Sequence, residues 1–225
     1  MKEKLLIKEN LEAVRSKIGV KNVTILAATK TVPADIINYA VTELGITDIG
    51  ENRVQELLEK YDALEKDKMK IHFIGTLQTN KVKYIIDKVC LIHSVDNIKL
   101  AAEIDRQAKK IGRVMDVLVE LNIGEEENKS GVMPGGLMPF LDEISGFESI
   151  RVKGLMTIGP ICANLSEYKK IFVKTYQIFI DILQKKLHNI DNPILSMGMS
   201  DSYEAAVECG ANMVRLGTAL FGIRN

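Results

Sequence analysis

The stretch Val23-Thr24-Ile25-Leu26-Ala27-Ala28-Thr29-Lys30-Thr31-Val32-Pro33 sets the architecture expected of this chain. Its apolar run over residues 23–29 predicts a buried strand, and Pro33 predicts the first position of a helix. Lys30 then lies at the C-terminal end of the first strand, which is the end where barrels of alternating strands and helices carry their chemistry. Lys30 is either a lysine extending into solvent or an amine that forms a Schiff base with an aldehyde.

The remainder of the chain repeats this strand-then-helix pattern. Gly45, Gly112 and Gly210 each fit the residue just past a helix end. A first helix is expected over residues 3–18, and the longest over 165–187, with an apolar stripe of Leu165, Tyr168, Phe172, Tyr176, Phe179 and Leu183. The expected strands are Thr24–Thr29, Asp48–Gly50, Ile71–Ile74, Leu91–Ser94, Met115–Leu121, Val152–Thr157, Ile194–Met197 and Met213–Leu216.

Eight strands alternating with helices predict a parallel sheet. In a chain of 225 residues without a linker or a break in composition, they fit a single closed (β/α)₈ (TIM) barrel domain over residues 1–225, with an extra N-terminal helix. The loop Gly124–Gly136 follows the fifth strand and is either a cover over a ligand at the mouth or a solvated surface loop.

The charge balance narrows the class of partner. Lys+Arg and Asp+Glu both number 30, and this zero net charge argues against a nucleic-acid partner. No apolar stretch approaches the length of a membrane span, and the charged start over residues 1–8 does not fit a signal peptide. A cytoplasmic protein without a membrane partner is therefore expected.

The cysteines and histidines indicate no metal site. Cys90, Cys162 and Cys209 are isolated and odd in number, and we interpret them as reduced core residues. The three histidines, His72, His93 and His188, lack ligand-like spacing to one another or to cysteine.

Two segments follow the seventh and eighth strands, Ser196–Ser202 and Arg215–Ala219. Loops at these two places often form a phosphate site, because free amide groups at a helix start attract an anion and glycine lets it approach the backbone. The alternative is ordinary helix capping by Ser200 or Asp201 and a tight turn at Gly217. The candidate phosphate ligands are the backbone at Gly198 and Gly217 and the hydroxyls of Ser200 and Thr218.

Arg215 ends the eighth strand and is expected to point into the barrel mouth. It either pairs with a nearby carboxylate or acts as a permanent donor to a ring nitrogen or an anion. A reactive Lys30 together with a phosphate site fits a ligand that carries an aldehyde and a phosphate on a flat ring. Pyridoxal 5′-phosphate (PLP) has this chemistry.

A set of motifs spread over the chain strengthens this prediction. They are 27–31 (AATKT), 50–56 (GENRVQE), 72–81 (HFIGTLQTNK), 128–131 (NKSG), 154–157 (GLMT) and the run 196–222. In this order and combination the chain resembles the YggS-type pyridoxal phosphate homeostasis proteins, a family similar to the barrel domain of alanine racemase, the fold-type III arrangement of PLP proteins. Two positions depart from the family: Ile71 replaces a frequent tryptophan, and Arg53 a frequent aromatic residue.

The resemblance implies roles for particular residues. Lys30 would hold PLP as a Schiff base, Arg215 would face the pyridine nitrogen, and Asn52 would lie beside the cofactor. Gly75, His72 and Met156 would line the same mouth. The phosphate would be held by Ser200, Gly217 and Thr218. The polar cluster Gln78, Asn80 and Lys81 would cap a helix or bind a second anion.

The same resemblance implies a carrier and not a catalyst. The racemase-type enzymes add a β-rich domain and a dimer partner, and no room for that domain is seen between Leu216 and Asn225. An arginine at the ring nitrogen also weakens the ring as an electron sink, because a guanidinium keeps its proton. We therefore expect a monomeric binder acting in PLP (vitamin B6) homeostasis that passes the cofactor to apo PLP-dependent enzymes. The alternatives are a slow amino-acid racemase and a Schiff-base aldolase acting on a sugar phosphate.

Overall fold

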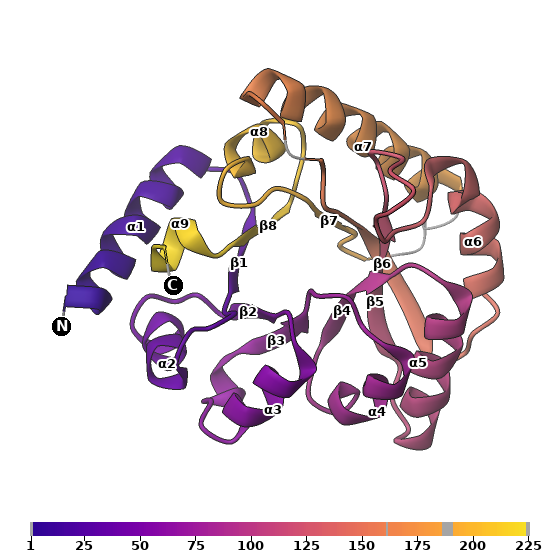
Figure 1. The fold of residues 1–225 in the computed structure, drawn as a ribbon, viewed down its shortest axis with the longest axis horizontal. Helices are drawn as coiled ribbons and strands as arrows, with labels where there is room; N and C mark the ends of the chain where they lie inside the picture. Colours follow the sequence, from indigo (N-terminus) through magenta and orange to yellow (C-terminus); the bar gives the residue numbers. More distant parts are fainter. Residues whose placement is uncertain (1, 161, 186–190, 224–225) are drawn as a thin grey trace.

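Eight parallel strands pair in chain order, and the last pairs with the first, so the sheet closes into a barrel (Figure 1). The computed structural model describes residues 2–160, 162–185 and 191–223. All eight predicted strands are confirmed, with boundaries shifted by two residues at most. They are β1 (Thr24–Ala28), β2 (Asp48–Glu51), β3 (Lys70–Phe73), β4 (Leu91–Val95), β5 (Met115–Leu121), β6 (Ile150–Thr157), β7 (Ile194–Ser196) and β8 (Met213–Leu216).

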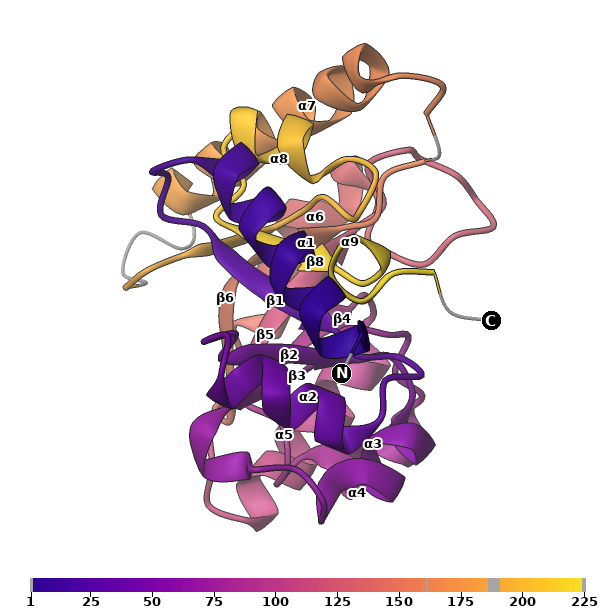
Figure 2. The ribbon, with the colours of Figure 1, turned by 90° about the vertical axis from the view of Figure 1, so that its left-hand side faces the viewer.

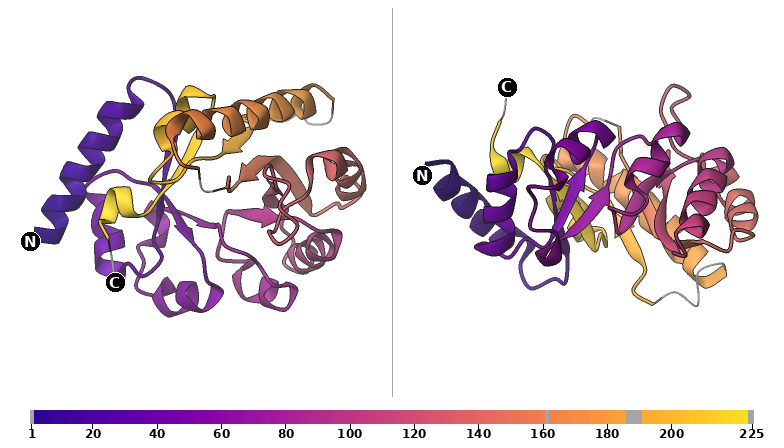
Figure 3. Two further views of the ribbon diagram at one scale, coloured as in Figure 1. Left: turned by 45° about the horizontal axis from the view of Figure 1, so that its top comes forward. Right: turned by 90° about the horizontal axis from the view of Figure 1, so that it is seen from below.

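Helices surround the barrel on its outside (Figures 1 and 3). The predicted first helix is confirmed, and its buried face is the predicted one: Ile7, Leu11, Val14 and Ile18. Pro33 takes the position just before α2, one residue earlier than predicted. The helices are α1 (Lys2–Ile18), α2 (Ala34–Thr42), α3 (Val54–Tyr61), α4 (Val82–Ile85), α5 (Ile98–Lys110), α6 (Leu137–Ile144), α7 (Leu165–Lys185), α8 (Tyr203–Glu208) and α9 (Thr218–Phe221).

The core has two parts because side chains alternate along a strand. Residues that point outward from the strands pack against the helices in one large cluster. Residues that point inward fill the barrel in two smaller clusters, built on Leu26, Ile74 and Met213 on one side and on Leu91, Leu118 and Met156 on the other. The barrel is therefore a filled core, and room for a ligand is found at its ends and not at its centre.

The predicted stripe of the longest helix is only partly right. The buried residues of α7 are Phe172, Thr175, Phe179 and Ile182. Leu165 and Tyr176 are 49% and 39% exposed. The true face follows the 3–4–3 spacing from Phe172, and Leu165 lies about two turns before that contact begins. The last two residues of the predicted helix, 186–187, lie outside the described residues, as does His188.

Local signals at the helix ends behave as expected. Gly45, Gly112 and Gly210 have φ values of 69°, 64° and 99°, which confirms that each provides the left-handed residue after a helix. Across the three described ranges, no helix combines the length and apolar character that a bilayer span requires.

The cysteine prediction needs one correction. All three are free thiols, but each is only half-buried and none lies in the core. Cys90 borders the interior cluster of Leu91, and burial raises the pKa of its thiol to about 11. The Cys209 thiol donates to Lys169 O on α7, and the Cys162 thiol donates to Pro160 O in the segment before that helix.

Candidate functional site at the carboxyl end of the barrel

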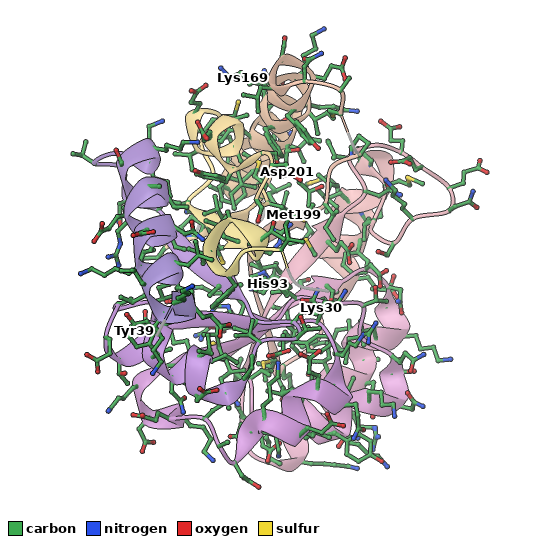
Figure 4. All side chains as sticks on the ribbon, turned by 60° about the vertical axis from the view of Figure 1, so that its left-hand side comes forward. Lys30, Tyr39, His93, Lys169, Met199 and Asp201 are labelled. Atoms are coloured by element: carbon green, nitrogen blue, oxygen red, sulfur yellow. The ribbon has the colours of Figure 1, made fainter. Side chains whose placement is uncertain are left out.

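Lys30 lies where the sequence placed it, directly after β1 at the carboxyl end of the strands. It lines a pocket of about 330 Å³ together with Asn52, Arg53, Gly75 and Glu120. Figure 4 shows Lys30 and His93 toward the middle of the molecule, whereas Tyr39 and Lys169 lie on the surrounding helices. The structure thus brings together three of the predicted residues: Lys30, Asn52 and Gly75.

The turn after Lys30 is strained. Thr31 has a φ of 60°, in the left-handed region that a β-branched residue rarely adopts. Its backbone N–H donates to the Glu56 carboxylate on α3. On the other side of Lys30, the Thr29 N–H donates to Gly50 O at 3.0 Å, and Thr29 O accepts from the Val32 N–H at 2.9 Å.

A set of charged residues on β2 and α3 surrounds this turn. The Lys60 ammonium donates to the carbonyl oxygen of Thr29 at 2.9 Å, to Glu51 Oε1 at 3.1 Å and to Glu56 Oε1 at 2.5 Å. Glu51 Oε1 also accepts from the Thr29 hydroxyl at 2.6 Å. We call Glu51, Glu56 and Lys60 the ionic clamp.

The pKa values of the two clamp carboxylates are shifted in opposite directions. Glu51 is completely buried, and burial raises its pKa above the ordinary glutamate value, against the lowering effect of Thr29 and Lys60. Its second oxygen, Oε2, is buried and has no hydrogen-bond partner among the described residues. Burial also acts to raise the pKa of Glu56, but the hydrogen bonds from Lys60 and from the Thr31 N–H together outweigh it and lower that pKa.

Gly75 has a steric reason to be glycine. A Cβ at this position would lie 2.1 Å from the backbone oxygen of Asn52. Because backbone cannot move aside as a flexible side chain can, the segment after β3 can lie this close to the Asn52 backbone only with glycine. Gly75 therefore shapes the wall of the Lys30 pocket beside Asn52.

The opposite edge of the mouth, after β7 and β8, is built from backbone. The Ser200 hydroxyl oxygen accepts from the N–H of Gly217 at 3.3 Å and from the N–H of Ala219 at 3.0 Å. Ser200 therefore caps the start of α9 and not of α8, the helix that follows it directly. Its own hydroxyl proton remains available to an acceptor. The exposed Thr218 is the first residue of α9.

The two glycines of this edge differ in kind. Gly198 has a φ of 92°, and a Cβ on it would lie 2.5 Å from the Ala206 side chain, so packing against α8 requires glycine there. A Cβ at Gly217 would meet Ala28 only at 3.7 Å, an ordinary contact. Packing therefore does not explain Gly217, and a glycine leaves the backbone of this turn open to close approach.

Arg215 is buried beneath this edge and forms no direct ion pair with a carboxylate of the described residues. Its guanidinium donates to Ser196 O at 2.9 Å, to Ser196 Oγ at 2.8 Å and to Thr157 O at 2.8 Å. Burial lowers its pKa to about 10, while the charge of Glu120 acts in the opposite direction. Arg215 thus stays protonated at neutral pH, with three of its five N–H groups used within the part of the chain described.

Glu120 joins the mouth to the loop Gly124–Gly136. Burial raises the pKa of this carboxyl, and Ser130 of the loop donates to its Oε1 at 2.9 Å. The Asn122 side chain holds the loop from within by donating to Glu126 O and Lys129 O. Most of the loop is exposed, as a solvated surface loop would be, but its Ser130 end reaches the pocket wall.

Two residues expected at the mouth lie elsewhere. Met156 is buried inside the barrel against Leu91 and Leu118. His72 lines a different pocket, of about 670 Å³, at the amino ends of the strands beside Thr24 and Asp48. The reason is strand stagger: the tilt of a closed barrel places residues near the ends of neighbouring strands at different heights.

His72 belongs to a polar chain inside the barrel. Its Nε2 lies 3.1 Å from Asp48 Oδ1, and its Nδ1 lies 3.0 Å from His93 Nε2. Hydrogen bonds from His72 and Thr47 lower the pKa of Asp48 in spite of burial, so Asp48 accepts the His72 proton. His93 then donates from Nε2, which leaves its buried Nδ1 as an acceptor without a partner in the described structure.

Two further expectations concern polar clusters. The Gln78, Asn80 and Lys81 cluster precedes α4, but no side-chain capping bond forms there, so the capping interpretation is wrong. The Lys81 ammonium lies 5.8 Å from the centre of the Tyr84 ring instead.

Within residues 2–160, 162–185 and 191–223, no group of three or more His, Cys, Asp or Glu side chains has the arrangement of a metal site.

Sequence reasoning missed the ionic clamp and Glu120. One signal was available: Glu51 and Glu120 are charged residues inside the strands Asp48–Glu51 and Met115–Leu121, which are otherwise almost wholly buried. A carboxylate in such a run is seldom buried without a partner. Lys60 carries no comparable signal, since a lysine in a helix is expected to be exposed and nothing in the local pattern marks this one as largely buried.

Comparison with known proteins agrees with this geometry. The family model of the alanine racemase N-terminal domain matches residues 6–225. The pyridoxal phosphate homeostasis protein of Aquifex aeolicus is 46% identical over 200 residues, covering 89% of this chain and 86% of that protein. Its namesake in Escherichia coli K12 is 34% identical over 233 residues, covering 97% of both.

Solved structures give the same result. PipY of Synechococcus elongatus PCC7942 with PLP bound superposes with a TM-score of 0.85 at 32% identity, over 96% of this chain and 100% of that one. The alanine racemase of Corynebacterium glutamicum has a TM-score of 0.72 at 14% identity, over 97% of this chain and 61% of that one. At that identity the second likeness concerns the fold alone.

Proposed function

We propose, from the premise that this chain belongs to the family of pyridoxal phosphate homeostasis proteins, that it binds PLP at the barrel mouth, with Lys30 as the covalent anchor, and acts in PLP homeostasis. The family match and the relative solved with PLP bound support the ligand. The single observation that carries the anchor is that Lys30 lines the mouth pocket with Asn52 and Gly75.

The residues present fit the cofactor. Gly217 is a glycine that packing does not require, and the Ser200 hydroxyl beside it has a proton to donate. These groups, with Thr218 at the start of α9, would hold the phosphate. Asn52 would lie along the ring from the opposite side, and the free N–H groups of Arg215 would serve the ring nitrogen.

The covalent step needs only Lys30 and the ligand. Lys30 would supply the amine and bound PLP the aldehyde: a C=N bond would replace the C=O bond, and the oxygen would leave as water with the two protons of the amine. No oxidant or reductant takes part, so the step reverses when water or another amine attacks the same carbon. Reversal of this kind suits a protein that holds the aldehyde and then releases it to apo PLP-dependent enzymes.

The properties of Arg215 favour a protein that holds PLP over one that uses it in catalysis. When bound, PLP can stabilise negative charge on a carbon attached to it, and it does so best with a protonated ring nitrogen. Arg215 is protonated and held by Ser196 and Thr157, so it would donate to that nitrogen without giving up a proton. The pocket also shows half-buried and exposed lining residues, and a wet site weakens electrostatic catalysis.

The anchor is tested by spectroscopy and reduction. The wild-type protein with added PLP should be yellow, and borohydride followed by peptide mass analysis should place a phosphopyridoxyl group on Lys30. Lys30→Ala should lose the reducible adduct, and Lys81→Ala is the matched control at a lysine outside the pocket. A reducible adduct kept in full by Lys30→Ala would overturn the assignment. A colourless protein that stays unmodified would instead favour the sugar-phosphate aldolase.

A slow amino-acid racemase is the second candidate, since alanine racemases share this fold. It predicts exchange of the α-hydrogen of alanine or serine with solvent deuterium. Exchange no faster than with free PLP would exclude it.

The protein is further proposed to act as a single-domain monomer in the cytoplasm. Its three free thiols suit a reducing compartment. Light scattering of the purified protein, with and without PLP, tests the monomer directly.

A further inference from the structure

We infer that the ionic clamp of Glu51, Glu56 and Lys60 is a positioning device for Lys30. This inference rests on the proposed function and deepens it: Lys30 would be the group that reacts, and the clamp would set where its amine stands.

The clamp holds the chain on both sides of Lys30. On the N-terminal side, Lys60 donates to the carbonyl oxygen of Thr29 at 2.9 Å. On the C-terminal side, Glu56 accepts the N–H of Thr31. These are the residues directly before and after Lys30, so the direction in which its side chain leaves the backbone depends on both bonds.

Every N–H group of the Lys60 ammonium has an acceptor within the clamp or the turn it holds. The Lys60 ammonium has three N–H groups, and it has three acceptors: Thr29 O, Glu51 Oε1 and Glu56 Oε1. Its side chain is 14% exposed and that of Glu51 is 0% exposed. An ammonium with every donor used and little contact with water has few other positions to adopt.

Stability alone does not account for such a cluster. Burying ions costs solvation free energy that their attraction seldom exceeds, and apolar residues of similar size are often as stable. The clamp also leaves Glu51 Oε2 buried without a partner. Helix α3 already has an apolar anchor in Leu57, which is fully buried. What the charged residues add is a fixed geometry at the turn.

The strained residue shows what that geometry resists. Thr31 is held at a φ of 60°, a left-handed conformation that is unfavourable for a residue with a Cβ. Without an acceptor for its N–H, Thr31 would relax toward negative φ and rotate the peptide that joins it to Lys30. The amine would then sit away from the pocket shared with Asn52 and Gly75.

The test removes the cation and measures the rate of adduct formation. Lys60→Met should slow the formation of the borohydride-trapped PLP adduct at Lys30 by about tenfold to a hundredfold, the usual loss when a reacting group is misplaced by about 1 Å. Lys60→Arg should restore most of the rate, because a guanidinium can also donate to several acceptors. Glu56→Gln keeps an acceptor for the Thr31 N–H and should slow the reaction less. It is the variant to measure if Lys60→Met fails to fold.

A second measurement tests the clamp without any cofactor. Hydrogen exchange of the Thr31 amide should be faster in Lys60→Met than in the wild type. Arg113→Met is the matched control: Arg113 donates to Ile86 O and Val89 O, far from the mouth, so its loss lowers stability without touching the turn. The inference would be overturned if Lys60→Met and Glu56→Gln both formed the adduct within twofold of the wild-type rate. It would also be overturned if Arg113→Met slowed adduct formation as much as Lys60→Met does. A wild-type protein without any adduct at Lys30 would overturn the proposed function itself.

Discussion

The two edges of the barrel mouth reach rigidity by different means. At the β1–β2 edge, charged side chains from α3 hold a strained turn around Lys30. At the β7–β8 edge, the Ser200 hydroxyl accepts from the N–H groups of Gly217 and Ala219, and with Gly198 and Gly217 it shapes the backbone that we propose as the phosphate site. A covalent anchor must point one atom at one target, whereas a phosphate accepts donors from several directions. The difference indicates that directional chemistry and anion binding call for different kinds of support.

The largest expected effect comes from Gly198→Ala. The substitution forces a Cβ into a φ of 92° and to 2.5 Å from the Ala206 side chain. We expect the free energy of unfolding to fall by about 2–4 kcal/mol, from strain and overpacking together. Denaturant unfolding measures it. A loss below about 1 kcal/mol would mean that α8 shifts freely and that the β7–β8 edge is less rigid than described.

Gly217→Ala should separate binding from stability at the same edge. The new Cβ meets only ordinary contacts, so the unfolding free energy should change by less than about 1 kcal/mol. PLP affinity should fall about tenfold, equal to about 1.4 kcal/mol, because the methyl group hinders approach to the backbone N–H. Titration by absorbance measures this, with Lys30→Ala as background to isolate the phosphate contribution. Unchanged affinity would remove Gly217 from the site.

Glu51→Gln tests the β1–β2 edge through pH. A folded pKa raised above the ordinary value of 4.5 means that the folded state binds more protons than the unfolded state in the interval between the two values. Stability from this group is thus lost as pH rises through that interval, by at most about 1.4 kcal/mol per pH unit. The variant should therefore gain stability relative to wild type as pH rises above 4.5. The exposed Glu59→Gln serves as the control, and a difference that does not vary with pH would contradict the raised pKa.

The smallest effect is expected from Thr31→Asn. Asparagine tolerates the left-handed region better than a β-branched residue, and Thr31 is exposed. Thermal unfolding should show a gain of about 0.5–1 kcal/mol with the backbone hydrogen bond to Glu56 kept. A loss of stability would show that the threonine side chain itself supports the turn.

Much of this structure could be predicted from the sequence, for a physical reason. Parallel strands buried on both faces are short apolar runs, and glycines mark the helix ends, so strands such as Met115–Leu121 are found with accurate boundaries. Lys30, Asn52 and Gly75 follow from the rule that strand ends meet at one mouth. PLP binding remains a prediction for all six proposed residues: Lys30, Asn52, Ser200, Arg215, Gly217 and Thr218.

The predictions that were wrong or missing depended on how neighbouring elements are displaced relative to one another in three dimensions. His72 lies in a strand next to those of the mouth residues, yet the stagger of the barrel puts it at the opposite end. Lys60 meets Glu51 only because α3 packs back along β2, and no local pattern announces that meeting. The sequence pattern thus identifies which strands contribute, while the heights of individual side chains require the closed barrel.

The contact of α1 with α9 has a consequence for how the protein is made. The two helices lie side by side (Figure 2), and the Asn10 side chain donates to Leu220 O at 2.9 Å across 210 positions of sequence. During synthesis α1 emerges early and keeps its apolar face of Ile7, Leu11, Val14 and Ile18 without this cover until the segment after β8 leaves the ribosome. The proposed phosphate edge is therefore completed late in biogenesis, and nascent chains that stall before Thr218 should be clients of chaperones.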